Sequence, residues 1–146
     1  MTLRVRWLGR VAYRDAHALQ RGLWEGGGDG WLLLLEHPPT YTLGVRAKPQ
    51  HVLVDPASVG AELVTTDRGG DVTYHGPGQL VGYPIVDVPR APDAIPAHVH
   101  RIEQLVIDAL ADLGVAGAGR LDGYPGVWLT AGRRGPRKIA AIGVRL

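Results

Sequence analysis

The segment from Arg68 to Pro84 holds the densest group of residues able to bind or polarise a substrate. Five glycines, an arginine, a histidine and a glutamine lie within this short stretch. Glycines let a backbone approach a ligand closely and leave N–H groups free to donate. Arg68 can anchor a carboxylate or a phosphate, and His75 can orient or polarise a carbonyl group. The alternative is a plain β-hairpin with a Gly-Pro-Gly turn and incidental polar residues, and the residue chemistry alone does not separate the two.

His37 belongs to a second group, where a strand-like run ends in His37-Pro38-Pro39. Proline restricts the residue before it to extended conformations, so this sequence predicts a rigid kink. One interpretation is an exposed imidazole, presented to a substrate at the kink. The other, which the residues favour, is a structural kink whose histidine is hydrogen-bonded within the protein.

Lys138 is the third candidate, and it follows the arginine-rich stretch from Arg133 to Arg137. The arginines alone are typical of a solvated basic loop or a nucleic-acid patch. Lys138 differs because it opens the apolar run of a predicted strand, where partial desolvation would suit its amine to proton transfer. The alternative is an edge-strand lysine that buries its stem and keeps its ammonium in water.

Residue types exclude several other kinds of site. The chain has no cysteine, which excludes disulfides, thiolate–metal sites and a cysteine nucleophile within these residues. Ser58 is the only serine, and its neighbours do not form a nucleophile elbow. His98 and His100 are two positions apart on a predicted helix and point to different faces, which is poor geometry for a metal. We therefore predict no metal site.

Two helices and a set of short strands must position these groups. Helices are predicted over 11–24 and 94–113, with Asp93 as the N-cap of the second. Strand signals cover 3–8, 31–36, 41–43, 52–54, 63–65, 72–74, 79–88, 127–129 and 139–146. This order predicts an α+β fold, a mixed β-sheet with flanking helices, in a single domain over 1–146.

Composition is that of an ordinary globular domain. Hydrophobic residues make up 45% of the chain, and the longest apolar run, Trp31–Leu35, is far too short to cross a membrane. The first residues lack the apolar stretch of a signal peptide, so we expect a cytoplasmic protein without membrane contact. The net charge of +2 hints at an acidic partner.

Together the three groups resemble the lipoyl(octanoyl) transferase family, which is related in fold to lipoate and biotin protein ligases. The segments similar to the family's motifs follow its order along the chain: Glu36–Pro39, Tyr41–Gly44, Arg68–Gly70, Thr73–Leu80, Gly126–Trp128 and Lys138–Arg145. A chance match of this length and order is hard to credit. The resemblance implies a biotin/lipoate protein ligase-like catalytic domain.

The resemblance also implies octanoyl transfer, the first step of protein lipoylation, without ATP or another cofactor. A family cysteine takes the octanoyl group from octanoyl-acyl carrier protein, and a lysine, here Lys138, lowers the pKa of that cysteine and shuttles protons. The implied acceptors are lipoyl domains of 2-oxoacid dehydrogenase E2 subunits and the glycine cleavage H protein. The residues that would line the acyl tunnel are Arg68, Gly69, Gly70, Asp71, Val72, Thr73, Tyr74, His75, Ala141, Ile142 and Gly143. The basic loop near Arg133 would dock the acidic carrier protein.

One departure from the family bears on activity. The family's cysteine follows the strand that Lys138 opens, and these 146 residues contain none. We therefore expect the domain to be incomplete at its C-terminus and the chain as it stands to be inactive. Two other functions stay open: an ATP-dependent lipoate or biotin protein ligase, and a non-catalytic module that docks acyl carrier protein through its basic loop. Nucleic-acid binding is disfavoured because that loop has no aromatic stacking platform near it.

Overall fold

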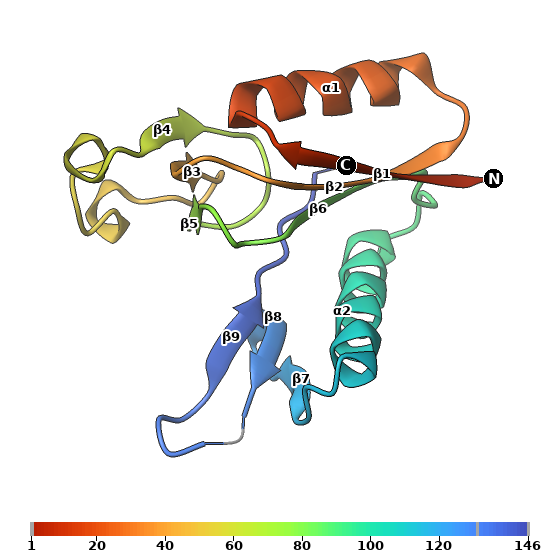
Figure 1. The fold of residues 1–146 in the computed structure, drawn as a ribbon. Coiled ribbons are helices and arrows are strands. Elements are labelled where there is room, and N and C mark those ends of the chain that lie inside the picture. Colours follow the sequence, from red (N-terminus) through yellow and green to blue (C-terminus); the bar gives the residue numbers. More distant parts are fainter. Residues whose placement is uncertain (1, 131, 146) are drawn as a thin grey trace. The chain divides into compact units, whose positions relative to one another are not determined.

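The computed structural model describes residues 2–130 and 132–145, which contain two α-helices and nine strands (Figure 1). The helices are α1 (Tyr13–Gly26) and α2 (Ala94–Asp112). The strands are β1 (Leu3–Arg10), β2 (Gly30–Glu36), β3 (Thr40–Leu43), β4 (Glu62–Thr65), β5 (Val72–His75), β6 (Val81–Ile85), β7 (Ala118–Leu121), β8 (Tyr124–Leu129) and β9 (Arg137–Ala140). The predicted α+β class is confirmed.

The chain divides into two compact units, Met1–Asp87 and Val88–Leu146. The first unit holds α1 and β1 to β6, and the second holds α2 and β7 to β9. Residues 86–93, which lead from one to the other, contain no helix or strand. Within the described residues, neither helix has the length and apolar character needed to span a bilayer.

The first unit contains two small mixed sheets. In one, β2 lies between a parallel β1 and an antiparallel β6. In the other, β3 lies between a parallel β4 and an antiparallel β5. The plain β-hairpin, considered as the alternative for Arg68–Pro84, does not form, because β5 and β6 pair with β3 and β2 instead of with each other. The strands β2 and β3 follow each other along the chain, and together they provide hydrogen-bonding partners for both β6 and β5.

The two sheets are successive parts of one bent ribbon. The pairs that flank the bend are Leu35 with Val81 and Thr40 with His75. Between them, the four residues 36–39 face the five residues 76–80. Pro38 and Pro39 have no N–H to donate to a ladder, so regular pairing stops here. The predicted His-Pro-Pro kink is confirmed.

Burial changes phase across this bend. Before it, the fully buried side chains of the run are at odd positions, and after it they are at even ones: Leu33, Leu35 and His37, then Thr40 and Thr42. Side chains of a strand alternate between faces with a period of two. The kink therefore lets a histidine and two threonines turn inward from one run of chain.

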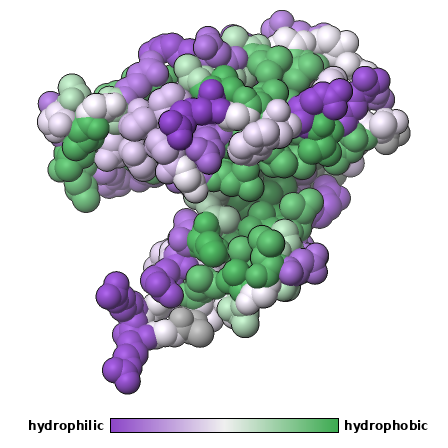
Figure 2. Space-filling view, in the orientation of Figure 1, coloured by the Kyte–Doolittle hydropathy of each residue, from purple (hydrophilic) through white to green (hydrophobic). Residues whose placement is uncertain are grey.

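The core of the first unit lies between α1 and one face of the β1–β2–β6 sheet. Its buried cluster consists of Ala16, Leu33, Leu35 and Val81. On β1 the side chains of Leu3, Val5 and Trp7 are 51%, 49% and 61% exposed. Apolar residues thus reach the surface as well as the core, as the space-filling view shows (Figure 2).

The second unit packs α2 beside an antiparallel sheet in the order β7-β8-β9. Strand β7 was not predicted, because its sequence, Ala-Gly-Arg-Leu, has no strand signal. The strand predicted over 139–146 is wrong beyond Ala140, since residues 141–145 are not in a strand and residue 146 lies outside the described part. Asp93 precedes α2 but makes no side-chain capping bond.

Two further differences concern the first unit. The segment 52–54 is no strand, because it lies between two short 3-10 turns, Pro49–His51 and Pro56–Val59, and pairs with no described strand. Strand β6 is shorter than the 79–88 predicted, since its ladder with β2 covers only residues 81–85.

Candidate functional site

His37 is fully buried at the kink and bonded through both ring nitrogens. Its Nδ1 lies 2.7 Å from the Val11 carbonyl oxygen, which can only accept, so Nδ1 carries the proton. Its Nε2 lies 2.7 Å from the Tyr83 hydroxyl and therefore accepts from it. Burial lowers the pKa of His37. The interpretation of a structural histidine, satisfied within the protein, is confirmed.

His75 lies beside His37, with the ring centroids 5.5 Å apart. Its Nδ1 donates to Gln79 Oε1 at 3.1 Å, and its Nε2 accepts from the Thr42 hydroxyl at 3.2 Å. Burial and the neighbouring His37 and Arg68 lower the pKa of His75 to about 4, although the bond to Gln79 opposes this. The imidazole is thus neutral near pH 7.

Arg68 stands at the other end of the same hydrogen-bond chain. Its Nη2 lies 2.7 Å from Thr42 Oγ1, 2.9 Å from the Thr42 carbonyl oxygen and 2.9 Å from the Asp71 carbonyl oxygen. Its Nη1 donates to the Gly69 carbonyl at 3.0 Å. Most of the guanidinium's N–H groups therefore bind the protein's own backbone, so Arg68 links the loop 69–71 to β3.

The direction of this chain of bonds is fixed at both ends. Arg68 can only donate, and the Tyr74 carbonyl, which accepts from Gln79 Nε2 at 3.0 Å, can only accept. Thr42 and His75 each accept from one side and donate to the other. This satisfied network runs from the buried Thr42 to the exposed Gln79 and favours one conformation of the segment.

The loop that contains Gly69 and Gly70 packs against residues 44–46. Gly44 donates its N–H to the Asp71 carbonyl, and a Cβ at Gly44 would overlap the Gly70 carbonyl and come within 2.7 Å of Arg68 Nη1. Gly70 itself has a φ of +102°, which favours glycine. Both glycines are thus required where the two loops meet.

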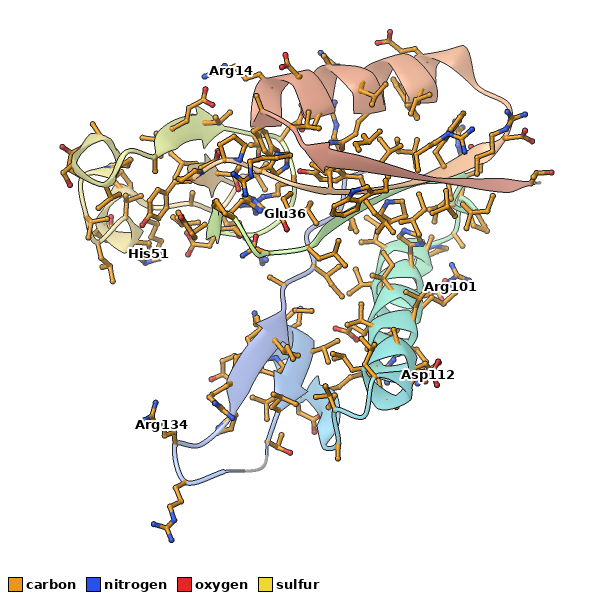
Figure 3. All side chains as sticks on the ribbon, in the orientation of Figure 1. Arg14, Glu36, His51, Arg101, Asp112 and Arg134 are labelled. Carbon is orange, nitrogen blue, oxygen red and sulfur yellow. The ribbon has the colours of Figure 1, made fainter. Side chains whose placement is uncertain are left out.

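Asp71, Val72, Thr73 and Tyr74 complete the segment 68–75, which the sequence predicts to form one wall of the acyl tunnel. The Asp71 carboxylate accepts from the Val72 N–H at 2.8 Å and is paired with His51, which Figure 3 labels. Partial desolvation alone would raise the pKa of this carboxyl, but these hydrogen bonds outweigh it and lower the pKa. Thr73 lies opposite Thr42 on β3, and Tyr74 packs its ring 5.1 Å from another tyrosine on β3.

Three groups that the sequence interpretation missed complete the cluster. The Tyr13 ring, at the start of α1, lies 5.2 Å from the His37 ring and 6.0 Å from the His75 ring. Tyr83 donates to His37, and burial raises its phenol pKa, so it stays protonated. Thr42 joins Arg68 to His75. None of these contacts has a local signal, because each depends on sheet pairing or on the packing of α1.

A surface pocket of about 470 Å³ lies beside this cluster in the first unit. The first turns of α1 and residues 64–67 line it, and Tyr13 contributes its ring to both pocket and cluster. At the other side, Glu36 accepts from the Gly78 N–H at 3.2 Å and ties down the Gly-Pro-Gly turn (Figure 3). The segment 68–75 is therefore a well-braced wall.

Lys138 and the segment Ala141–Gly143 belong to the second unit. Within that unit Lys138 is exposed, so the unit by itself does not provide the desolvation predicted from the sequence. Its Nζ lies 4.9 Å from the centroid of the Trp128 ring. Residues 141–143 follow β9 in an irregular conformation. The arginine-rich loop lies between β8 and β9, with Arg134 at its turn (Figure 3).

Comparison with known proteins agrees with this architecture. Residues 12–146 match the lipoyl protein ligase A/B catalytic domain. The chain is 54% identical over 115 residues to an octanoyltransferase of Gloeobacter violaceus, a match that covers 79% of this chain and 48% of that protein. It is 50% identical over 145 residues to an octanoyltransferase of Mycobacterium tuberculosis, covering 97% and 60% of the two chains.

Solved structures show the same fold. A bipartite lipoate protein ligase from Thermoplasma acidophilum superposes with a TM-score of 0.68 at 20% identity, over 88% of this chain and 51% of that one. At this identity the likeness concerns the fold alone. The chain spans between about half and two thirds of the length of the octanoyltransferases that it matches.

Proposed function

Because the chain belongs to the lipoyl protein ligase A/B catalytic domain family, we propose that it is part of an octanoyltransferase that acts in protein lipoylation. The observation that carries this is its identity of 50% to an octanoyltransferase over 97% of its residues. The donor would be octanoyl-acyl carrier protein, and the acceptor a lysine of a lipoyl domain. Neither ATP nor a cofactor enters the reaction.

The chemistry needs a thiolate, which we propose to come from sequence outside these residues. The thiolate attacks the octanoyl carbonyl, the bond to the carrier's sulfur breaks, and the carrier thiol leaves with a proton from Lys138. The acceptor amine then attacks the acyl-enzyme, an amide forms, and Lys138 takes a proton from the amine while the thiolate is released. Before the reaction, the ammonium of Lys138 stabilises the thiolate and so lowers the pKa of the cysteine.

The acyl chain would lie against the braced wall 68–75 and the segment Ala141–Gly143. The hydrogen-bond network from Arg68 to Tyr74 supports this proposal, because a rigid wall costs little ordering entropy when a flexible acyl chain binds. Backbone N–H groups of the glycines are suited to polarise the thioester oxygen.

The partners follow from the same proposal. The arginine-rich loop between β8 and β9 would receive the acidic carrier protein, since complementary charge speeds association. Lipoyl domains of 2-oxoacid dehydrogenase E2 subunits and the glycine cleavage H protein would be the acceptors, in the cytoplasm. Binding to the carrier should weaken as salt is raised.

The test uses the protein expressed from its gene with whatever sequence adjoins residues 1–146. Octanoyl-acyl carrier protein and a lipoyl domain are supplied without ATP, and octanoylation of the lipoyl domain is followed by intact mass. Transfer is the expected result. A product that forms only from free octanoate and ATP would make the protein a ligase, and carrier binding without any product would make it a docking module. Either outcome contradicts the proposal.

A further inference from the structure

Lys138 and Trp128 face each other across two strands of the second unit. They are register partners on β9 and β8, and residues directly opposite in an antiparallel pair project to the same face. The ammonium nitrogen lies 4.9 Å from the centre of the indole ring. This distance is within the range of a cation–π contact, and indole is the strongest aromatic partner for an ammonium.

The indole ring is itself held in place. Its Nε1 donates to the Tyr124 carbonyl oxygen at 2.9 Å. The Tyr124 ring meets it edge-on, with the centroids 6.0 Å apart and an angle of 74° between the planes. A bonded and packed ring presents one fixed surface to the ammonium.

The stem of Lys138 lies over Gly126, where a side chain would clash with the backbone of β9. A Cβ at Gly126 would lie 3.4 Å from Lys138 Cδ and Cε and 2.5 Å from the Ala140 carbonyl oxygen. Gly126 has a φ of +110°, a conformation that other residues rarely adopt. A glycine is therefore required where β8 meets Ala140, and the lysine stem lies against it.

Gly126 is fixed from beneath by a buried carboxylate. Glu103 of α2 is 3% exposed, and its Oε1 accepts from the Gly126 N–H at 2.9 Å. Its Oε2 accepts from Arg120 Nε at 2.9 Å and from His100 Nδ1 at 3.0 Å. A charged hydrogen bond of this kind is stronger than a neutral one, so the backbone under the lysine is firmly held.

We propose that Trp128 is a positioning residue for Lys138: it holds the ammonium at one place above β8, so that the proton donor of the acyl transfer is pre-oriented. This inference rests on the role proposed above for Lys138. A free lysine side chain samples many rotamers, and one that transfers a proton gains when those rotamers are restricted beforehand. Trp128 acts only through Lys138 and touches no substrate.

The geometry can be measured in solution with the 146-residue chain, because it contains only two lysines, Lys48 and Lys138. With isotope-labelled lysine, the side-chain methylenes of Lys138 should show an upfield ring-current shift that those of Lys48 lack. Trp128→Leu should abolish this shift and Trp128→Phe should retain part of it. Absence of the shift in the unaltered chain would overturn the inference, and this measurement needs no variant to fold.

The kinetic test uses the protein expressed from its whole gene. Trp128→Leu should slow acyl-enzyme formation from octanoyl-acyl carrier protein by roughly 3- to 30-fold in kcat, the kinetic equivalent of a cation–π contact, with little change in KM. Trp128→Phe should recover part of the loss. A change in KM alone, or equal losses in both variants, would contradict positioning.

Failure of this inference can be told apart from failure of the proposed function. If Lys138→Ala abolishes acylation but Trp128→Leu leaves kcat unchanged, Lys138 keeps its role and the positioning by Trp128 is wrong. If Lys138→Ala itself acylates normally, the proposed role of Lys138 fails, and the inference that rests on it fails too.

Discussion

At the scale of single residues, His37 and His75 are alike in having both ring nitrogens bonded within the first unit. His37 donates to a backbone carbonyl and accepts from Tyr83, and His75 donates to Gln79 and accepts from Thr42. A proton added to either ring would require the Tyr83 or Thr42 hydroxyl to rotate and give up the bond that it donates. The pair therefore stiffens the wall and is not free to act as a base.

The neutral state of His75 predicts a loss of stability in mild acid. Its pKa is lowered to about 4 in the folded protein from an ordinary value of 6.5, so between these pH values the unfolded chain binds more protons. Its contribution, up to roughly 3 kcal/mol, is complete above about pH 6.5 and is lost as the pH falls toward 4. Urea midpoints measured across this range should fall with the pH.

The control for this prediction is His75→Gln, which removes the titrating group. Its urea midpoint should depend less on pH than that of the unaltered protein, although His37, whose pKa is also lowered, leaves part of the slope. Equal slopes in the two proteins would show that His75 is not the group responsible.

A second prediction at this scale concerns Lys138. In the protein expressed from its whole gene, Lys138→Ala or Lys138→Arg should reduce acyl-enzyme formation by roughly 10²- to 10⁴-fold, the usual effect of removing a proton-transfer group. Arginine keeps the charge but cannot give up its proton at neutral pH. Lys48→Arg, at the chain's other lysine, is the matched control and should label normally with a thioester donor. Normal labelling of both Lys138 variants would refute the assignment.

At the scale of elements, the contact between residues 44–46 and 68–71 depends on a missing side chain. Gly44→Ala would force its Cβ against the Gly70 carbonyl and Arg68, and we expect a loss of about 1–3 kcal/mol in the free energy of unfolding. Gly22→Ala in α1 meets no atom within 4 Å and should stabilise the protein by about 0.5–1 kcal/mol. Urea denaturation compares the two, and equal midpoints would contradict the clash.

The elements also show what local sequence can and cannot predict. Both helices have apolar residues at helical spacing, the strand predicted over 31–36 is a continuous apolar run, and the kink at Pro38 follows from proline geometry, so these were predicted. The pairing of β5 with β3 was not, because it joins residues some 30 positions apart and no local pattern reports it. For the same reason the sequence pointed to Arg68 and His75 but not to Thr42, which connects them.

At the scale of the whole molecule, each unit has its own buried residues, and the segment between them is exposed over 89–93. We expect limited trypsin digestion to cut after Arg90, because this segment has no helix or strand to protect its backbone. The paired strands β2 and β6 should resist cleavage by trypsin. Mass spectrometry of the fragments checks this, and Arg90→Gln should remove the cut. Persistent protection at Arg90 in the unaltered chain would show that the segment is covered.

The His-Pro-Pro bend makes the spacing between β2 and β3 part of the site. Four residues there face five, and the burial pattern changes phase across them, so that His37, Thr40 and Thr42 are all buried. A shift of β3 by one position against β5 would turn Thr42 to the other face and separate Arg68 from His75. Gene lineages and engineered libraries should therefore keep the length of this bend constant and place insertions in exposed loops, such as the one around Gly27 and Gly28.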